Sequence, residues 1–274
     1  MTLRPIVVAD SITRVGSEAK GAVAVNGSHG GVYAAFCAAK LSVAAAIFND
    51  AGVGRDEAGI GGLLYLETLA IPAAAVGHMS ARIGDGADMM ARGLISHANA
   101  RAGSLGCVAG MACREAAEAL RRAQEGGLEP PPEQEASFLI VESPPPVWAL
   151  DSASLVGPQH QGAIVVTGSH GGLLGGRVES ALKYDAKAAL FNDAGIGIDD
   201  AGTRRIFALD KRGIAAATVA AASARIGEAR STYEDGILSR VNRTAAGLGI
   251  AAGMSAREFV AITRKSREKG REAR

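Results

Sequence analysis

The sequence predicts an α/β protein made of two tandem, pseudo-symmetric repeats, each a mainly parallel sheet flanked by helices. Three observations support this fold class. A set of short motifs occurs twice in the same order, and short apolar segments alternate with helical ones in each copy. The third is composition: 36 of the 274 residues are glycine and only 4% are aromatic, which favours close packing and tight turns.

The duplication is evident from several collinear blocks. The first motif recurs after 141 residues and the other two after 143, so the second copy has two extra residues between its first two motifs. The three pairs are Gly-Ser-His-Gly-Gly at 27–31 and 168–172, Phe-Asn-Asp-Ala-Gly at 48–52 and 191–195, and Ser-Ala-Arg-Ile-Gly at 80–84 and 223–227.

A proline-rich segment marks the join between the copies. Proline triplets at 130–132 and 144–146 favour extended backbone and stop helices, and residues 137–141 between them have the pattern of one short strand. The predicted parts are a first α/β unit at 1–124, a linker with a strand at 125–145, and a second α/β unit at 146–274.

Each element of the first repeat follows from local sequence. Apolar, partly β-branched runs predict buried strands, and the segments between them have the pattern of helices; continuous apolar strands of this kind favour a mainly parallel sheet covered on both faces. The predicted strands are 22–25, 43–48 and 71–76, and the predicted helices are 32–41, 56–69, 88–102 and 112–123.

The first motif places a hydroxyl and an imidazole at the end of a strand. Ser28 and His29, with Ser169 and His170 in the second copy, are candidate catalytic residues, since histidine suits proton transfer near neutral pH. The glycines allow a ligand to approach the backbone, and the following helix end could receive an anion. The alternative is a tight turn required for packing. The candidate ligand-binding glycines are Gly30, Gly31, Gly171 and Gly172.

The second motif places an amide and a carboxylate beside the first. Asp50 and Asp193 could orient the histidines, hold a metal or accept a substrate proton, and Asn49 and Asn192 could contact the substrate. The alternative is that both side chain types bond to their own loop, as Asn and Asp often do in turns.

The third motif follows the third strand and contains an arginine. Arg82 and Arg225 are candidate clamps for a carboxylate or phosphate, with Ser80 and Ser223 beside them. The alternative is a structural salt bridge, for example to Asp50 or Asp193.

Composition excludes several classes. A net charge of +1 argues against a nucleic-acid binder, and no apolar stretch approaches the length of a membrane span. Three cysteines and the absence of a signal-peptide pattern predict a cytoplasmic protein. Because Cys37, Cys107 and Cys113 have no counterparts in the second copy, a thiol nucleophile common to both halves is excluded.

The strand ending in Ser28-His29-Gly30, followed by the turn that begins at Asp50, is similar to the caspase-like peptidases, above all their bacterial repeat-associated branch. Asp193 begins the corresponding turn in the second copy. The resemblance covers about the middle half of each repeat. It departs at the nucleophile, because Gly52 and Gly195 stand where that family has cysteine, so thiol peptidase activity is not implied.

The sequence leaves two functions open. One is an enzyme, an amide-type hydrolase or a proton-transfer isomerase, acting on a small anionic metabolite through the duplicated loops. The other is a non-catalytic small-anion-binding protein on a degenerate peptidase-like fold. No cofactor is predicted and a divalent metal is left open. Small residues on the helices would also suit close packing in a homodimer.

Overall fold

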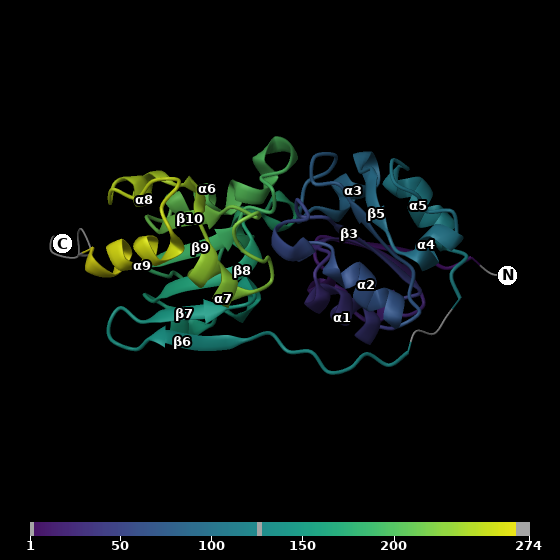
Figure 1. Cartoon of the computed structure of the whole chain (residues 1–274), viewed down its shortest axis with the longest axis horizontal. Helices are drawn as coiled ribbons and strands as arrows, with labels where there is room; N and C mark the ends of the chain where they lie inside the picture. The colour runs from purple at the N-terminus through teal and green to yellow at the C-terminus, as the bar shows by residue number, and fades with distance from the viewer. Residues whose placement is uncertain (1–2, 125–127, 267–274) are drawn as a thin grey trace.

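The structure, a computed structural model, describes residues 3–124 and 128–266. It contains two mixed α/β units that lie side by side along the long axis of the molecule (Figure 1). Each unit has one sheet with helices packed on it. The α/β class and the repeat-like organisation predicted from the sequence are therefore confirmed.

The first sheet has five strands in simple sequential order. Its first four strands are parallel and the last pairs antiparallel with its neighbour. The strands are β1 (Ile6–Ala9), β2 (Val23–His29), β3 (Ala45–Asn49), β4 (Ala73–Val76) and β5 (Ile95–Ala98).

The second sheet repeats this order and adds one strand. The predicted linker strand is observed as β6 (Ser137–Val141), which pairs antiparallel with the first strand of the second repeat and so belongs to that sheet. The others are β7 (Val147–Leu150), β8 (Ile164–His170), β9 (Ala188–Asn192), β10 (Ala215–Val219) and β11 (Leu238–Val241).

Helices cover both faces of the first sheet. On one face α1 (Val32–Lys40) and α2 (Gly61–Thr68) pack over Ala46 and Phe48, and on the other α3 (Gly86–Arg92) and α5 (Cys113–Leu120) pack over Val25. Because neighbouring strand residues face opposite sides, burial of both faces explains the continuous apolar strands.

The second unit has its own helices. They are α6 (Arg204–Asp210), α7 (Ala229–Asp235), α8 (Arg243–Ala246) and α9 (Ala256–Lys265).

Two helix predictions need correction. The helix predicted at 88–102 is wrong: α3 ends before Gly93, whose backbone is extended, and β5 and a short helix α4 (Ala100–Ser104) follow. The helix predicted at 56–69 is shorter. Its first part is a turn in which Asp56 and Glu57 both have positive φ, and α2 begins only at Gly61.

The second repeat also lacks a counterpart of α1. Two 3-10 turns, η6 (Leu174–Gly176) and η7 (Val178–Ser180), occupy that part of the chain. Arg205 stands where the first repeat has Gly62, which packs tightly against α1. Its buried guanidinium donates to the Gly172 carbonyl and stacks on Phe191 at 5.0 Å, so a side chain substitutes for part of the missing helix.

Candidate functional site

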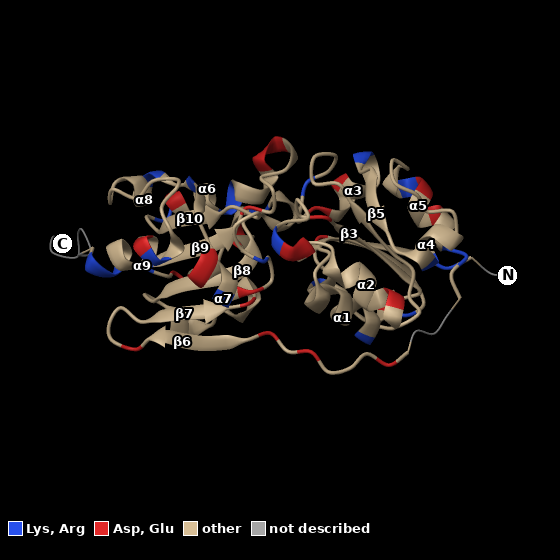
Figure 2. Ribbon diagram, viewed as in Figure 1, with Lys and Arg blue, Asp and Glu red and all other residues tan. Residues whose placement is uncertain are grey.

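The motif loops of the two repeats meet each other. Backbone hydrogen bonds of 2.9 Å join Arg55 N to the Ala221 carbonyl and Ile198 N to the His78 carbonyl. These bonds are equivalents of each other in the two copies, so the units face one another across an approximate two-fold axis. We call this contact the seam. Figure 2 shows charges of both signs where the units meet.

Two glycines lie at the centre of the seam. Gly52 and Gly195 both have φ of +73°, and a Cβ on Gly52 would lie 2.8 Å from the Cα of Gly195. No side chain fits there, because the two backbones are in contact. These are the positions that correspond to the nucleophile in the caspase-like resemblance, and in this fold they join the repeats.

The predicted serines bond to backbone and to a neighbouring hydroxyl. Ser28 Oγ accepts from Ile12 N at 3.1 Å and lies 3.3 Å from Ser11 Oγ, and Ser169 Oγ accepts from Ala153 N at 2.9 Å. Neither hydroxyl has a hydrogen bond to a histidine within residues 3–124 and 128–266. The structure therefore does not join the predicted hydroxyl to the predicted base.

Each predicted histidine lies against the other repeat: a Cβ on Gly227 would be 3.4 Å from His29 Cε1, and a Cβ on Gly84 would be 3.4 Å from His170 Cε1. His29 Nδ1 accepts from Gly31 N and His170 Nδ1 accepts from Gly172 N, both at 3.1 Å, which leaves the proton of each neutral ring on Nε2. Burial lowers the pKa of His29 to about 4. Burial, then the charges of Arg205 and His29, lower the pKa of His170 well below its ordinary value.

The predicted glycine amides also have protein partners. Gly30 N donates to the Asn49 carbonyl and Gly171 N donates to the Asn192 carbonyl, while the amides of Gly31 and Gly172 bond to the histidines described above. These four amides are therefore committed within the fold.

The predicted asparagines hold their own loops. Asn49 Oδ1 accepts from Ala51 N and its Nδ2 donates to the Ala81 carbonyl; Asn192 makes the equivalent bonds to Ala194 and Ala224. Each asparagine is fully buried and ties the second motif to the third.

The predicted arginines are paired across the seam. Arg82 contacts Asp85 and Asp88 in its own repeat and Asp199 in the other. Arg225 contacts Glu228 in its own repeat and Asp56 in the other.

The serines beside the arginines are also engaged. Ser80 Oγ donates to the Gly77 carbonyl and Ser223 Oγ to the Ala220 carbonyl, both at 2.7 Å. All four side chains of the third motif thus have partners in the fold.

The two aspartates have different surroundings. Asp50 Oδ1 accepts from Gly52 N, His78 N and His78 Nδ1. Burial alone would raise the pKa of Asp50, but the hydrogen bonds from His78 and Gly52 outweigh it, so that the pKa lies below its usual value. Asp193 Oδ1 accepts from Gly195 N and Ala221 N, and no imidazole among the described residues donates to it.

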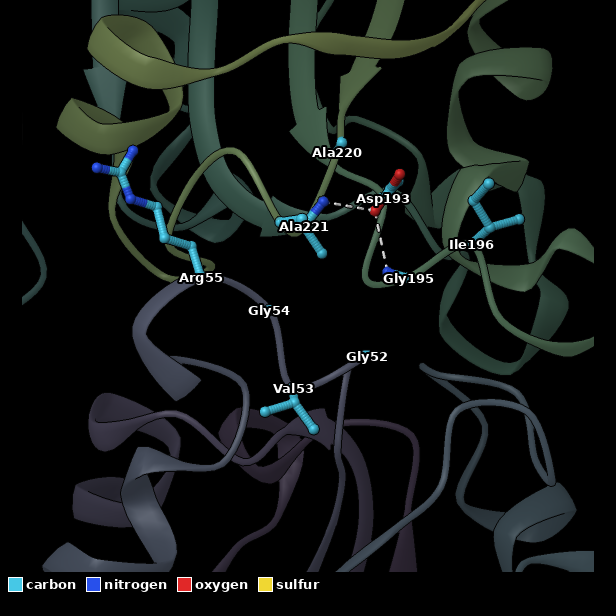
Figure 3. Close-up of a pocket in the computed structure, with 10 residues that line it drawn as sticks. Gly52, Val53, Gly54, Arg55, Asp193, Gly195, Ile196, Ala220 and Ala221 are labelled. Atoms are coloured by element: carbon cyan, nitrogen blue, oxygen red, sulfur yellow. Dashed lines mark hydrogen bonds between the residues drawn. The ribbon is translucent and has the colours of Figure 1, made fainter.

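A pocket opens beside Asp193. It has a volume of about 500 Å³ and lies in the seam between residues 52–55 and the second repeat (Figure 3). Asp193, only 3% exposed, supplies a carboxylate to its wall. The other lining residues are 52–55, Gly195, Ile196 and the three alanines at 220–222. The Arg55 side chain extends away from Asp193 (Figure 3), toward Ser223 and Asp235.

The residue that distinguishes the two aspartates is not among the predicted site residues. His78 corresponds to Ala221, so it belongs to none of the motifs that the two copies share. Its position in the sequence could have marked His78 as a site residue, because it follows the third strand and stands two residues before the Ser-Ala-Arg motif.

Within residues 3–124 and 128–266, no group of three or more His, Cys, Asp or Glu side chains is arranged to hold a metal ion. None of the described helices has the length and apolar character that crossing a membrane requires.

Comparison of the chain with protein-family models, with curated proteins and with solved structures finds no match. The resemblance to caspase-like peptidases stays a prediction.

Proposed function

We propose that this protein binds a small polar molecule in the seam pocket, with Asp193 as the principal polar contact, and does not convert it chemically. The observation that carries the proposal is a carboxylate, almost wholly buried, on the wall of an open pocket of about 500 Å³. Concave sites with small apolar walls and few polar groups are typical of small-molecule sites.

Binding has more support than the hydrolase or isomerase predicted from sequence. Catalysis by the first two motifs needs the hydroxyl, the imidazole and the carboxylate in mutual contact. Ser28 bonds instead to Ser11 and Ile12, and Asp50 bonds to His78. A low pKa also makes His29 a weak base.

The sign of the ligand follows from the pocket wall. The sequence predicted an anion because of the arginines, yet Arg82 and Arg225 are paired with acids. Two charged side chains line the pocket, and one of them, Arg55, is paired with Asp56 and Asp235, which leaves the charge of Asp193 for a ligand. A ligand that offers a hydrogen-bond donor or a positive charge therefore fits this wall better than an anion does. A cytoplasmic location and a homodimer stay predictions.

A thermal-shift screen tests the binding function. The probes are imidazole, guanidinium, methylammonium, acetamide, acetate and phosphate, applied to the wild type, to Asp193→Asn and to Asp50→Asn. Asparagine keeps the Oδ1 acceptor that each turn requires, removes the charge and replaces Oδ2 with an amide NH2 that donates. Asp50→Asn is the matched control, because His78 already occupies its surroundings.

The expected result is that at least one donor probe raises the Tm of the wild type and of Asp50→Asn by about 3 °C near ten times its Kd, and fails to do so in Asp193→Asn. The function is contradicted if no probe shifts the wild type, or if the two asparagine variants respond alike.

A further inference from the structure

The seam contains the same structural position twice, once filled and once open. On the filled side, the His78 ring occupies the space beside Asp50. On the open side, Ala221 is the counterpart of His78, and the pocket lies beside Asp193. The filled side therefore shows which chemical group the open side can accept.

The filled side has well-defined contacts. His78 Nδ1 lies 2.9 Å from Asp50 Oδ1, and the ring also lies against the other repeat: its Cδ2 and Nε2 would be 2.9 and 3.1 Å from a Cβ on Gly195. The side chain is 26% exposed, so one edge reaches solvent. A planar ring thus fits between an aspartate and a glycine backbone.

The backbone of the open side matches that of the filled side. Asp193 Oδ1 accepts from Ala221 N at 2.8 Å and from Gly195 N at 2.9 Å. The equivalent distances at Asp50 Oδ1 are 2.9 Å from His78 N and 3.0 Å from Gly52 N. With both backbone donors in place, the acceptor is oriented as on the filled side and lacks only the third donor.

We propose that the ligand of the seam pocket carries an imidazole or imidazolium group, which donates an N–H to Asp193 Oδ1 and packs its ring against Gly52. This rests on the proposed binding function and names its ligand class. The neutral and the protonated ring both donate such a bond, and the protonated ring also offsets the charge of Asp193. The alanine side chains around Asp193 suit the flat ring better than a fully hydrated ammonium ion.

The test uses imidazole itself as the probe, on full-length protein without a histidine tag. Binding is followed by NMR titration of the backbone amides. The amide of residue 221 reports the open side and that of residue 78 reports the filled side, because Gly52 and Gly195 both line the pocket and His78 also lies against Gly195. The proteins are the wild type, Ala221→His and His78→Ala.

The three proteins have distinct expected results. In the wild type, imidazole shifts the Ala221 and Gly195 amides in a saturable way. Ala221→His places a ring in the pocket, and its affinity for imidazole falls about tenfold or more. His78→Ala opens the second position, so saturable shifts also appear at the amide of residue 78.

The proposal is overturned if Ala221→His binds imidazole as tightly as the wild type, or if the wild type shows no saturable shift at Ala221. Should His78→Ala fail to fold, judged by circular dichroism, the Ala221→His comparison decides alone. Failure of the ligand class and of the function are distinguishable: if imidazole fails while another probe still depends on Asp193, only the ligand class is wrong.

Discussion

The two sides of the seam have the same backbone scaffold and different contents. At Asp50 the scaffold encloses an imidazole ring from the protein itself, and at Asp193 it borders an open pocket. On each side one backbone hydrogen bond joins the repeats, and its acceptor is the carbonyl of residue 78 or of residue 221. The difference teaches that these two positions contribute to the contact through their main chain, which leaves the side chain at position 78 or 221 free to differ.

The largest effect on stability is expected at a seam position that is glycine in both copies, Gly52 and Gly195. Gly52→Ala puts a Cβ 2.8 Å from the Cα of Gly195, and neither backbone can withdraw without parting the repeats. We expect a loss of about 3–5 kcal/mol in the free energy of unfolding, measured by urea denaturation.

Gly110→Ala is the matched control for this substitution. Gly110 has φ of +87° with nothing within 4 Å of an added Cβ, so only backbone strain of about 1–2 kcal/mol is expected there. Equal losses at Gly52 and Gly110 would show that the contact between the repeats is not what holds Gly52.

An intermediate effect on stability is expected from the pH dependence of the two buried histidines, His29 and His170. Their pKa values are lower in the folded chain than in the unfolded one, so the unfolded state binds more protons below about pH 6.5. Stability is thus fully present above pH 6.5 and falls as the pH drops. His29, with a folded pKa of about 4, contributes up to about 3 kcal/mol of this loss between pH 6.5 and 4.

Urea denaturation at pH 7, 5.5 and 4.5 measures this dependence. His29→Gln and His170→Gln should each flatten it, because each removes a ring whose pKa is lower in the folded chain than in the unfolded one. The same slope in both variants as in the wild type would contradict the assignment to these rings.

The smallest effect is expected at the salt bridges across the seam. Arg82→Gln and Arg225→Gln should each cost less than about 1 kcal/mol, since these pairs are partly exposed. Arg82 contacts three acids and its side chain is 31% exposed, against two acids and 41% for Arg225, so its loss should be the larger.

Salt separates this electrostatic contribution from the packing of the arginine stems. Added salt at about 0.5 M should reduce both losses, as urea denaturation at low and high salt would show. If Arg225→Gln lowered the free energy of unfolding more than Arg82→Gln does, contacts other than these ion pairs would determine the contribution of the two arginines to stability.

Much of the fold could be predicted from the sequence, because a pattern that occurs in both repeats is better supported than one that occurs once. The linker strand was predicted with its observed bounds, 137–141, and both sheets are mainly parallel as expected. The helix predicted at 88–102 failed because β5 has only four residues, too few to establish a period of two. The chain leaves α3 at Gly93, whose backbone is extended, and it enters α4 at Asn99, whose buried side chain caps that helix. Both changes of direction depend on tertiary contacts.

The candidate site was harder to predict, for a physical reason. Identity between the copies marks residues such as Asn49 and Asn192, and here those residues hold the seam. The pocket results from a difference, Ala221 in place of His78, and from the contact of two repeats whose relative placement no motif encodes. Comparing the copies for their mismatches near Asp50 and Asp193 would have found it.

The linker strand β6 has a consequence for how the two sheets meet other chains. It covers the outer side of β7, whereas the described residues place no strand outside β1, its counterpart. Unpaired strand edges are templates for edge-to-edge aggregation, and short strands limit that hazard. The four residues of β1, with Val8 44% exposed, thus form an edge of the first sheet that could pair with another chain, whereas β6 covers the equivalent edge of the second sheet.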